Sequence, residues 1–267
     1  MTVGAEPSGS APAGSPPLLR ATGVSRSYDG VHAVADVSME IRPREIVGLI
    51  GPNGAGKTTL INLLSGFDLP TAGTIEFDGA DITGWSAERR ARTGLARTFQ
   101  HGHLFADLPL RENVELASLA VGTGSREARQ LADELLEALD LRDRGDIHAG
   151  ALAHGEQQKA GVARALASRP RFVLLDEPAA GLSETDVDAF VELLDNVRTT
   201  YGASVLVVEH NVALIMRVSD KIHVLDGGRT LAVGTPAEIR ENIDVTAAYL
   251  GSAGTEPPIE APPSDGV

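Results

Sequence analysis

Nearly continuous apolar runs mark the strands of this chain, and segments with helical periodicity separate them. Residues 172–176 and 204–208 are apolar almost throughout, which is typical of strands covered on both faces in a parallel sheet. A third buried strand is predicted at 45–50, where it runs into a glycine-rich turn and a helix from about residue 56. Further strands are expected at 18–27, 37–41, 74–78, 221–226 and 230–233, and further helices at 86–92, 111–121, 126–140, 156–168 and 183–200.

The order of these elements indicates an α/β protein. The helix at 183–200 lies between the strands at 172–176 and 204–208, as in a crossover that joins parallel strands. The last two strands are joined by two glycines, so we expect a hairpin there. Residues from about 101 to 152 show helical spacing with few β-branched residues, and we interpret them as an inserted helical subdomain.

Both ends of the chain have the composition of disordered tails. Residues 1–17 are rich in Pro, Gly, Ser and Ala, and residues 252–267 combine prolines with acidic side chains. The folded domain is therefore expected to span 18–251. No apolar run approaches the roughly 20 residues of a membrane-spanning helix, and the first residues do not resemble a secretion signal.

The charge balance and the absence of cysteine narrow the function classes. The chain has 23 Lys and Arg against 37 Asp and Glu, a net charge of −14. A balance of this sign repels the phosphate backbone, so no nucleic-acid partner is expected. Without cysteine there is no disulfide, no thiolate zinc site and no cysteine nucleophile, which fits a cytosolic protein.

The turn after the strand at 45–50 carries the first candidate chemistry. Residues 51–58 match the phosphate-loop pattern G-x-x-x-x-G-K-[ST], although a purely structural glycine turn is the alternative. Its backbone N–H groups and the positive end of the helix would bind phosphate oxygens. Lys57 would reach the β and γ phosphates of ATP, and the Thr58 hydroxyl would bind Mg²⁺. The expected nucleotide-binding residues here are Gly51, Asn53, Gly54, Ala55, Gly56, Lys57, Thr58 and Thr59.

Two carboxylates end the apolar strand at 172–176. Asp176 at the strand tip can hold Mg²⁺ through water, because hard cations prefer oxygen ligands. Glu177 points elsewhere and could polarise an attacking water. An ordinary strand that ends in solvated acids is the alternative, and the phosphate loop upstream favours the site.

A short segment before the helix at 156–168 resembles the signature of the ABC family of transport ATPases. Residues 152–157 read Leu-Ala-His-Gly-Glu-Gln, where the family has L-S-G-G-Q-Q. Leu152, Gly155 and Gln157 match strictly, and a plain helix N-terminus is the alternative for this segment alone. The segment lies close before the Asp-Glu strand, as the family requires.

Four further features follow in the order of that family. They are Tyr28, where the family stacks a ring on adenine, residues 97–100 as the Q-loop, residues 179–182 as the D-loop, and His210 as the switch histidine. The resemblance covers 18–251 and implies a P-loop NTPase of the ABC ATPase type, with a mostly parallel core sheet, an N-terminal antiparallel β portion and an inserted helical subdomain. It also implies the roles of the site residues: Glu177, His210, Lys57 and Gln100 in catalysis, Thr58, Gln100 and Asp176 around Mg²⁺, and Tyr28, Ala153, His154, Gly155 and Glu156 in nucleotide binding.

Some of these residues have simpler interpretations. Tyr28 could be a half-buried strand aromatic, and His210 could be a satisfied histidine at a strand end. His101 and His103 have a spacing that metal ligands use, but no further His or Cys lies nearby. A solvated loop is therefore expected around them.

The resemblance implies a dimer that sandwiches two ATP molecules, each held by the phosphate loop of one subunit and the signature segment of the other. In-line attack by a water held by Glu177 and His210 would break the γ-phosphate bond and let the dimer open. Ala153 replaces the usual signature serine and removes a hydroxyl contact, so weaker closure is expected. Glu156 replaces the commoner glutamine.

Within the family, the chain is similar to the ATPase subunits of branched-chain amino-acid importers. The similar segments are 176–182, 207–211, 234–239 and 248–251. The implied partners are membrane permease subunits, a second ATPase subunit that is identical or a sister chain, and indirectly a solute-binding protein, all meeting at the cytoplasmic face of the membrane. Subunits that serve urea import, short-amide import or lipopolysaccharide export remain alternatives, because the ATPase does not touch the cargo and such subunits could look alike.

Functions outside transport have less support in the sequence. ABC ATPases of DNA repair or translation carry long coiled-coil insertions or two cassettes in one chain, and this sequence has one cassette and no such insertion. A switch GTPase needs a base-reading Asn-Lys-x-Asp, which the sequence does not contain.

Overall fold

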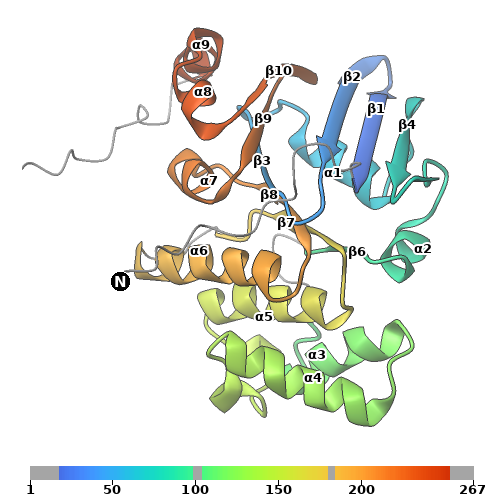
Figure 1. The fold of residues 1–267 in the computed structure, drawn as a ribbon, viewed down its shortest axis with the longest axis vertical. Coiled ribbons are helices and arrows are strands. Elements are labelled where there is room, and N and C mark those ends of the chain that lie inside the picture. The colour runs from blue at the N-terminus through green and yellow to red at the C-terminus, as the bar shows by residue number, and fades with distance from the viewer. Residues whose placement is uncertain (1–17, 99–103, 180–183, 253–267) are drawn as a thin grey trace, which may run out of the picture.

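The computed structural model describes residues 18–98, 104–179 and 184–252, except the side chains of 184–186 and 250–252. Its strands form two sheets (Figure 1). The antiparallel sheet has the order β2-β1-β4-β5, and the second sheet has the order β10-β9-β3-β8-β7-β6. The strands are β1 (Leu19–Tyr28), β2 (Val31–Ile41), β3 (Ile46–Ile50), β4 (Ala72–Phe77), β5 (Ala80–Asp81), β6 (Leu95–Arg97), β7 (Phe172–Asp176), β8 (Ser204–Val208), β9 (Lys221–Asp226) and β10 (Arg229–Gly234).

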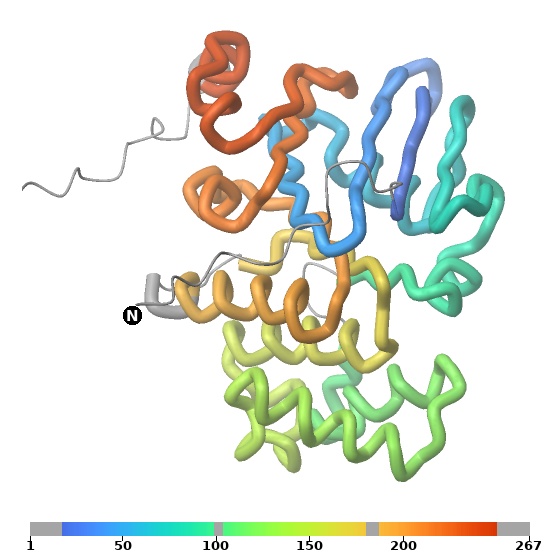
Figure 2. Tube along the Cα trace, viewed as in Figure 1, coloured from blue at the N-terminus to red at the C-terminus, as the bar shows by residue number. Residues whose placement is uncertain are grey.

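Most helices pack against the two sheets, whereas α3 and α4 pack against each other and against α5. They are α1 (Lys57–Ser65), α2 (Ala87–Arg92), α3 (Leu110–Ala120), α4 (Ser125–Ala138), α5 (His154–Ala167), α6 (Glu184–Thr199), α7 (Val212–Val218), α8 (Pro236–Arg240) and α9 (Ile243–Ser252), with 3-10 turns at Arg142–Arg144 and Ala149–Ala151. Figure 2 shows α3 and α4, in green, at the opposite end of the molecule from the red C-terminal helices. None of the helices in the described ranges is long and apolar enough to cross a membrane.

The second sheet is parallel from β9 to β6, and both of its faces are covered. Alternate side chains of each central strand enter different hydrophobic cores, as β7 shows: Val173 and Leu175 pack toward α5 and α6, whereas Phe172 and Leu174 pack toward α1 and the antiparallel sheet. This arrangement confirms the prediction of strands covered on both faces. It also explains why their sequences show no polar alternation.

The structure corrects several element boundaries predicted from sequence. β2 begins at Val31 and not at residue 37, because it pairs with β1 along its whole length. Asp36 has a positive φ of 56°, and the pairing register shifts opposite it, so the two-residue period of the strand is broken. β5, β6, α7, α8 and α9 were not predicted. β6 has only three residues and owes its existence to parallel pairing with β7.

A fully buried arginine joins α2 to the end of α1. Arg90 donates from Nη1 to the carbonyl oxygens of Leu63 and Leu64 at 2.7 and 2.8 Å. Its other donors reach the carbonyls of residues 82, 83 and 85 at 2.8 to 3.1 Å. Burial lowers the pKa of Arg90 to about 10, so the side chain is still charged at neutral pH. The cation thus satisfies carbonyls at the last turn of α1, where the helix dipole favours positive charge.

Replacing Arg90 with methionine should lower the free energy of unfolding by more than about 3 kcal/mol, because five carbonyl groups each lose the hydrogen bond from the guanidinium inside the protein. Urea unfolding followed by circular dichroism measures this. Arg92→Met is the matched control, since Arg92 forms an exposed pair with Glu88 on the same helix. The control should lose less than about 0.5 kcal/mol. Equal losses in the two variants would contradict the assigned role.

His223 is a second buried polar side chain, on β9. Its Nε2 lies 2.9 Å from Thr230 Oγ1 on β10. Burial lowers the pKa of His223 to about 4, and nearby Lys221 adds to the effect. The folded protein therefore resists protonation that the unfolded chain accepts below about pH 6.5. Stability is lost as pH falls from about 6.5 toward 4, because the unfolded state binds the extra proton.

His223→Gln should remove about 2 kcal/mol of the difference between the free energies of unfolding at pH 7 and pH 5. Urea titrations at the two pH values measure it. The surface variant His148→Gln, matched in residue type, should keep the full difference. If the His223 variant keeps it as well, another group controls the acid sensitivity.

Candidate functional site

The turn at 51–56 has a backbone that only glycine can adopt at two of its positions. Gly51 and Gly56 have φ angles of 155° and 96°. A Cβ on Gly56 would lie 2.4 Å from the carbonyl oxygen of Ala33, and one on Gly51 would lie 2.2 Å from that of Leu225. The turn is therefore held close to both β2 and β9, directly after β3.

The first residues of α1 complete this phosphate loop. Lys57 is buried, and its Nζ donates to the carbonyl oxygens of Gly51 and Pro52 at 2.6 and 3.1 Å. The first turn of α1 contains no acidic residue, and Gly56 supplies no side-chain cap. The helix end thus keeps its partial positive charge, which suits an anion. Of the predicted loop residues, Asn53, Gly54 and Thr58 are exposed, Thr59 is half-buried and Ala55 is buried.

Asp176 ends β7, and its carboxylate and its backbone are each held by a neighbouring residue. Its Oδ2 lies 3.0 Å from Arg97 Nη2, and its backbone N–H donates to Thr98 Oγ1 at 3.3 Å. Arg97 also donates to Asn62 and Ser65 of α1. The sequence placed Arg97 only inside the Q-loop pattern. Its charge at the end of a short apolar run was the signal that the sequence offered. The partners of Arg97 could not be predicted, because they depend on the pairing of β6 with β7.

Glu177 and His210 come together at the ends of two paired strands. Their Oε1 and Nε2 atoms are 2.7 Å apart. Glu177 has a φ of 48°, and its N–H donates to the carbonyl oxygen of Val208 at 2.9 Å. This left-handed turn directs Glu177 away from Asp176 and toward the end of β8. The two residues are 33 positions apart in sequence, and the structure brings them together as the resemblance implies.

Glu209 is a buried carboxylate behind this pair, and in the sequence it fell only within the importer-like segment 207–211. Its Oε1 accepts the N–H of Ala179 at 2.6 Å, and its Oε2 accepts the N–H of His210 at 3.2 Å. Burial raises the pKa of Glu209 above its ordinary value, although these hydrogen bonds oppose the rise. Glu209 therefore links the backbone after Glu177 to the backbone of His210.

The signature-like segment forms the N-terminus of α5, with Ala153 as its N-cap and His154 as its first residue. Ala153 has no side-chain acceptor, but its N–H donates to Glu156 Oε2 at 2.9 Å. Arg144 Nε donates to Glu156 Oε1 at 2.7 Å. Although burial raises it, the pKa of Glu156 lies below its ordinary value because of these two bonds. Gly155 lies in the first turn, and the bonds of Ala153 and Glu156 do not involve the phosphate loop of the same chain.

Tyr28 lies at the end of β1 with 41% of its surface exposed. Its hydroxyl bonds to Asp68, and the Arg26 guanidinium lies 4.8 Å from the ring centre. Arg26 Nη2 also pairs with Asp68 at 2.9 Å. The ring is thus tied to the segment after α1, with much of its surface open to solvent.

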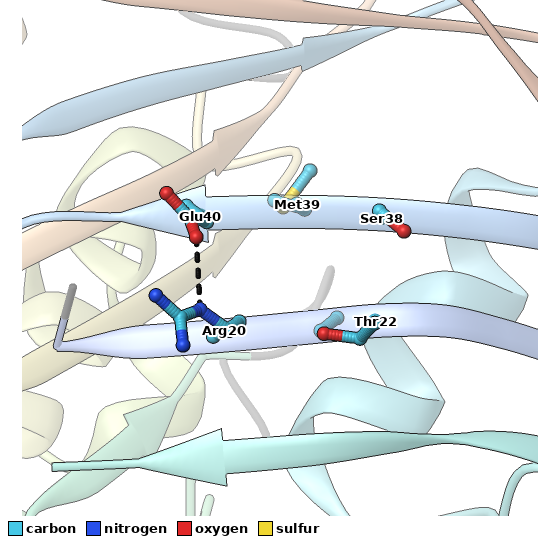
Figure 3. Close-up of a pocket in the computed structure, with 6 residues that line it drawn as sticks. Arg20, Thr22, Ser38, Met39 and Glu40 are labelled. Atoms are coloured by element: carbon cyan, nitrogen blue, oxygen red, sulfur yellow. Dashed lines mark hydrogen bonds and ion pairs between the residues drawn. The ribbon is translucent and has the colours of Figure 1, made fainter. Parts of the chain in front are cut away.

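Several predicted residues lie outside the described part of the chain. They are Gln100 with its neighbours Phe99, His101 and His103, and Ala180, Gly181 and Leu182 of the D-loop. In the described ranges, no three His, Cys, Asp or Glu side chains gather into a metal cluster. A separate hollow lies on the antiparallel sheet, where Arg20 pairs with Glu40 beside Thr22, Ser38 and Met39 (Figure 3). None of the predicted site residues lines it.

Comparisons with known proteins agree with this geometry. Residues 34–180 match the family described as ABC transporter, and residues 229–255 match the family described as branched-chain amino acid ATP-binding cassette transporter. The chain is 39% identical over 252 residues to the high-affinity branched-chain amino acid transport ATP-binding protein BraF of Pseudomonas aeruginosa, covering 89% of this chain and 99% of that protein. It is 40% identical over 254 residues to the corresponding protein LivG of Escherichia coli, covering 90% and 100%.

A solved structure supports the same relationship. The dimeric structure of an ATP-binding cassette in a post-hydrolysis state, bound to ADP and Pi, superposes with a TM-score of 0.75 at 25% identity. The match covers 82% of this chain and 98% of that one. A family match over more than half of the chain and full-length relatives near 40% identity lead to one conclusion: this chain belongs to the ABC transporter family, as one of its ATP-binding ATPase subunits.

Proposed function

We propose that this chain hydrolyses ATP with Mg²⁺ at the phosphate loop and thereby drives a membrane importer of branched-chain amino acids. The observation that carries the catalytic part is the 2.7 Å contact between Glu177 and His210 at the strand ends beside Asp176. The relatives BraF and LivG, named for branched-chain amino acid transport, support the cargo, as does the match at residues 229–255.

The nucleotide would occupy the phosphate loop. Backbone N–H groups in the first turn of α1, at Thr58 and Thr59, would donate to the phosphates at the positive end of the helix. Lys57 would exchange its bonds to the carbonyls of Gly51 and Pro52 for bonds to the β and γ phosphates. Tyr28 exposes enough of its ring for a base to stack on it, which contributes about 1–3 kcal/mol in other nucleotide complexes.

The residues at the loop fit a magnesium ion. Thr58 offers a hydroxyl and Asp176 a carboxylate, both hard oxygen donors, and phosphate oxygens and water would complete the shell. The described residues contain no cluster of three acidic or histidine side chains, and binding through one or two carboxylates is typical of magnesium held jointly with a nucleotide. Bound there, Mg²⁺ supplies charge neutralisation at the β and γ phosphates. Gln100, which the family resemblance also assigns to the ion, is proposed on that resemblance alone.

Glu177 would orient the attacking water and accept its proton. His210 holds the carboxylate of Glu177 at 2.7 Å, and Glu209 holds the backbone on both sides of that pair. The water would then attack the γ phosphorus in line with the leaving oxygen, with Lys57 stabilising the developing charge. Rigid placement of Glu177 is the contribution of β7 and β8 to the reaction.

A second ATPase subunit would complete each site. The N-terminus of α5, with the backbone N–H groups of His154 and Gly155, would face the γ phosphate bound by the partner. Glu156 brings negative charge to this helix end, and the Arg144 pair at 2.7 Å offsets it. The loss of the serine hydroxyl at Ala153 supports weaker closure. We further propose that the subunits bind permease subunits at the cytoplasmic face of the membrane.

Glu177→Gln should reduce ATP turnover roughly 10²- to 10⁴-fold, because an amide cannot accept the proton of the water. Affinity for ATP should change little, since Glu177 is proposed to act on the attacking water and not to bind the phosphates. Phosphate release and binding of a fluorescent ATP analogue measure the two quantities. Glu241→Gln, at the exposed end of α8, serves as the matched control and should hydrolyse normally. A Glu177 variant with normal turnover would remove Glu177 from the base position.

The cargo can be tested in a transport-deficient strain. Expression of this chain with the permease and binding-protein subunits of a branched-chain amino-acid importer should restore uptake of radiolabelled leucine, whereas Lys57→Ala should abolish it by removing the phosphate-binding ammonium. Uptake of urea and short amides is measured in parallel. Restoration of either of these in place of leucine would contradict the proposed cargo but not the ATPase activity.

A further inference from the structure

A buried arginine connects the helix of the phosphate loop to the strand that carries Asp176. Arg97 Nη2 lies 3.0 Å from Asp176 Oδ2. Its Nη1 donates to Asn62 Oδ1 at 2.7 Å and to Ser65 Oγ at 2.9 Å. One guanidinium thus joins α1, β6 and β7 directly below the edge where the phosphate loop and Asp176 lie.

Burial restricts the geometry of the ion pair between Arg97 and Asp176. The side chains of Arg97 and Asp176 are 7% and 14% exposed, and the Arg97 guanidinium lies 5.3 Å from the ring centre of Phe67. Charges removed from water need close, well-directed partners to offset the cost of desolvation. The planar fork of arginine reaches the α1 acceptors and the carboxylate at once, which the single ammonium of lysine cannot do. The fork therefore fixes the distance between α1 and the end of β7.

Two further bonds hold Asp176 in one orientation. Its N–H donates to Thr98 Oγ1, and Thr98 N–H donates to the carbonyl oxygen of Leu174 at 2.9 Å. The backbone of Asp176 is thus set by its neighbour strand, and its carboxylate by Arg97. Thr58, the other proposed magnesium ligand, stands on the same helix as Asn62 and Ser65. Arg97 consequently spans the two elements from which the ion would be bound.

We infer that Arg97 is a positioning residue for magnesium: it holds the Asp176 carboxylate at a set distance from the Thr58 helix, so that the two bind the ion of the Mg·ATP complex together. This inference rests on the proposed function of Asp176 as the magnesium-binding carboxylate. Partners of metal ligands commonly contribute 10- to 100-fold in metal affinity or activity.

A purely electrostatic role for Arg97 predicts the opposite change in magnesium binding. A cation near the ion repels it, so an Arg97 that acted only through its charge would weaken magnesium binding, and its removal would strengthen it. A positioning Arg97 strengthens the coupling between magnesium and nucleotide, and its removal weakens that coupling. Lysine separates the two effects because it keeps the charge and loses the fork.

The test measures binding of a fluorescent non-hydrolysable ATP analogue to the full chain, with magnesium and with EDTA. The dissociation constant in EDTA divided by that in magnesium reports how strongly magnesium and nucleotide binding are coupled, and it requires no turnover. Arg97→Met should reduce this ratio about 10- to 100-fold, with the constant in EDTA unchanged. Arg97→Lys should recover part of the loss. Asn62→Ala, which removes one bond of Arg97 and leaves Asp176 intact, should reduce the ratio about 2- to 10-fold.

Arg171→Met is the matched control, since Arg171 forms an exposed pair with Asp78 away from the loop, and its ratio should equal that of the wild type. Thermal melts identify a variant that fails to fold, and Asn62→Ala then decides the question. An unchanged or increased ratio in Arg97→Met, or in folded Asn62→Ala, overturns the inference. Half-saturating magnesium for ATP turnover should rise in parallel with the loss of the ratio.

Asp176→Asn separates this inference from the function on which it rests. If Asp176→Asn leaves the ratio unchanged, the proposed role of Asp176 is wrong. If Asp176→Asn lowers the ratio and Arg97→Met does not, only the inference about Arg97 fails. A double variant that loses no more than Asp176→Asn alone supports the inference, because both residues then act through the same carboxylate.

Discussion

Parallel pairing of β3, β8 and β7 brings the carboxyl ends of three strands to one edge of a sheet that is buried on both faces. Polar side chains cannot be placed within such strands without cost, so they gather where the strands end. The phosphate loop follows β3, Asp176 ends β7 with Glu177 directly after it, and Glu209 and His210 follow β8. The residues proposed for the chemistry are thus brought together by the same packing that forms the core.

At this edge the protein controls charge through paired, partly buried groups. Arg97 meets Asp176, His210 meets Glu177, and Glu209 accepts two backbone N–H groups. A buried charge with a directed partner keeps a single position, because any movement leaves it without compensation. Such rigidity suits phosphoryl transfer, where catalysis depends on placement and electrostatics more than on covalent participation of the protein.

The N-terminus of α5 shows how a departure from the family pattern can be accommodated. Ala153 has no side-chain oxygen to cap the helix. The other half of the capping pattern is present, because the Glu156 carboxylate accepts the N–H of Ala153. The acidic charge that this brings to the helix end is paired with Arg144. The helix terminus retains backbone donors despite both substitutions, which is consistent with membership of the ABC transporter family.

The sequence alone determined the fold class, the phosphate loop and the family, because these depend on local patterns: apolar runs, a glycine turn and acids in a set order. It also proposed that Glu177 and His210 act on the same water, and the two residues lie in contact although 33 positions separate them. Only the tertiary structure decided the partners of Arg97 and Glu209 and the existence of β6, since a three-residue strand has no periodicity of its own. A buried charge is recognised by what surrounds it, and its surroundings come from segments that are distant in the chain.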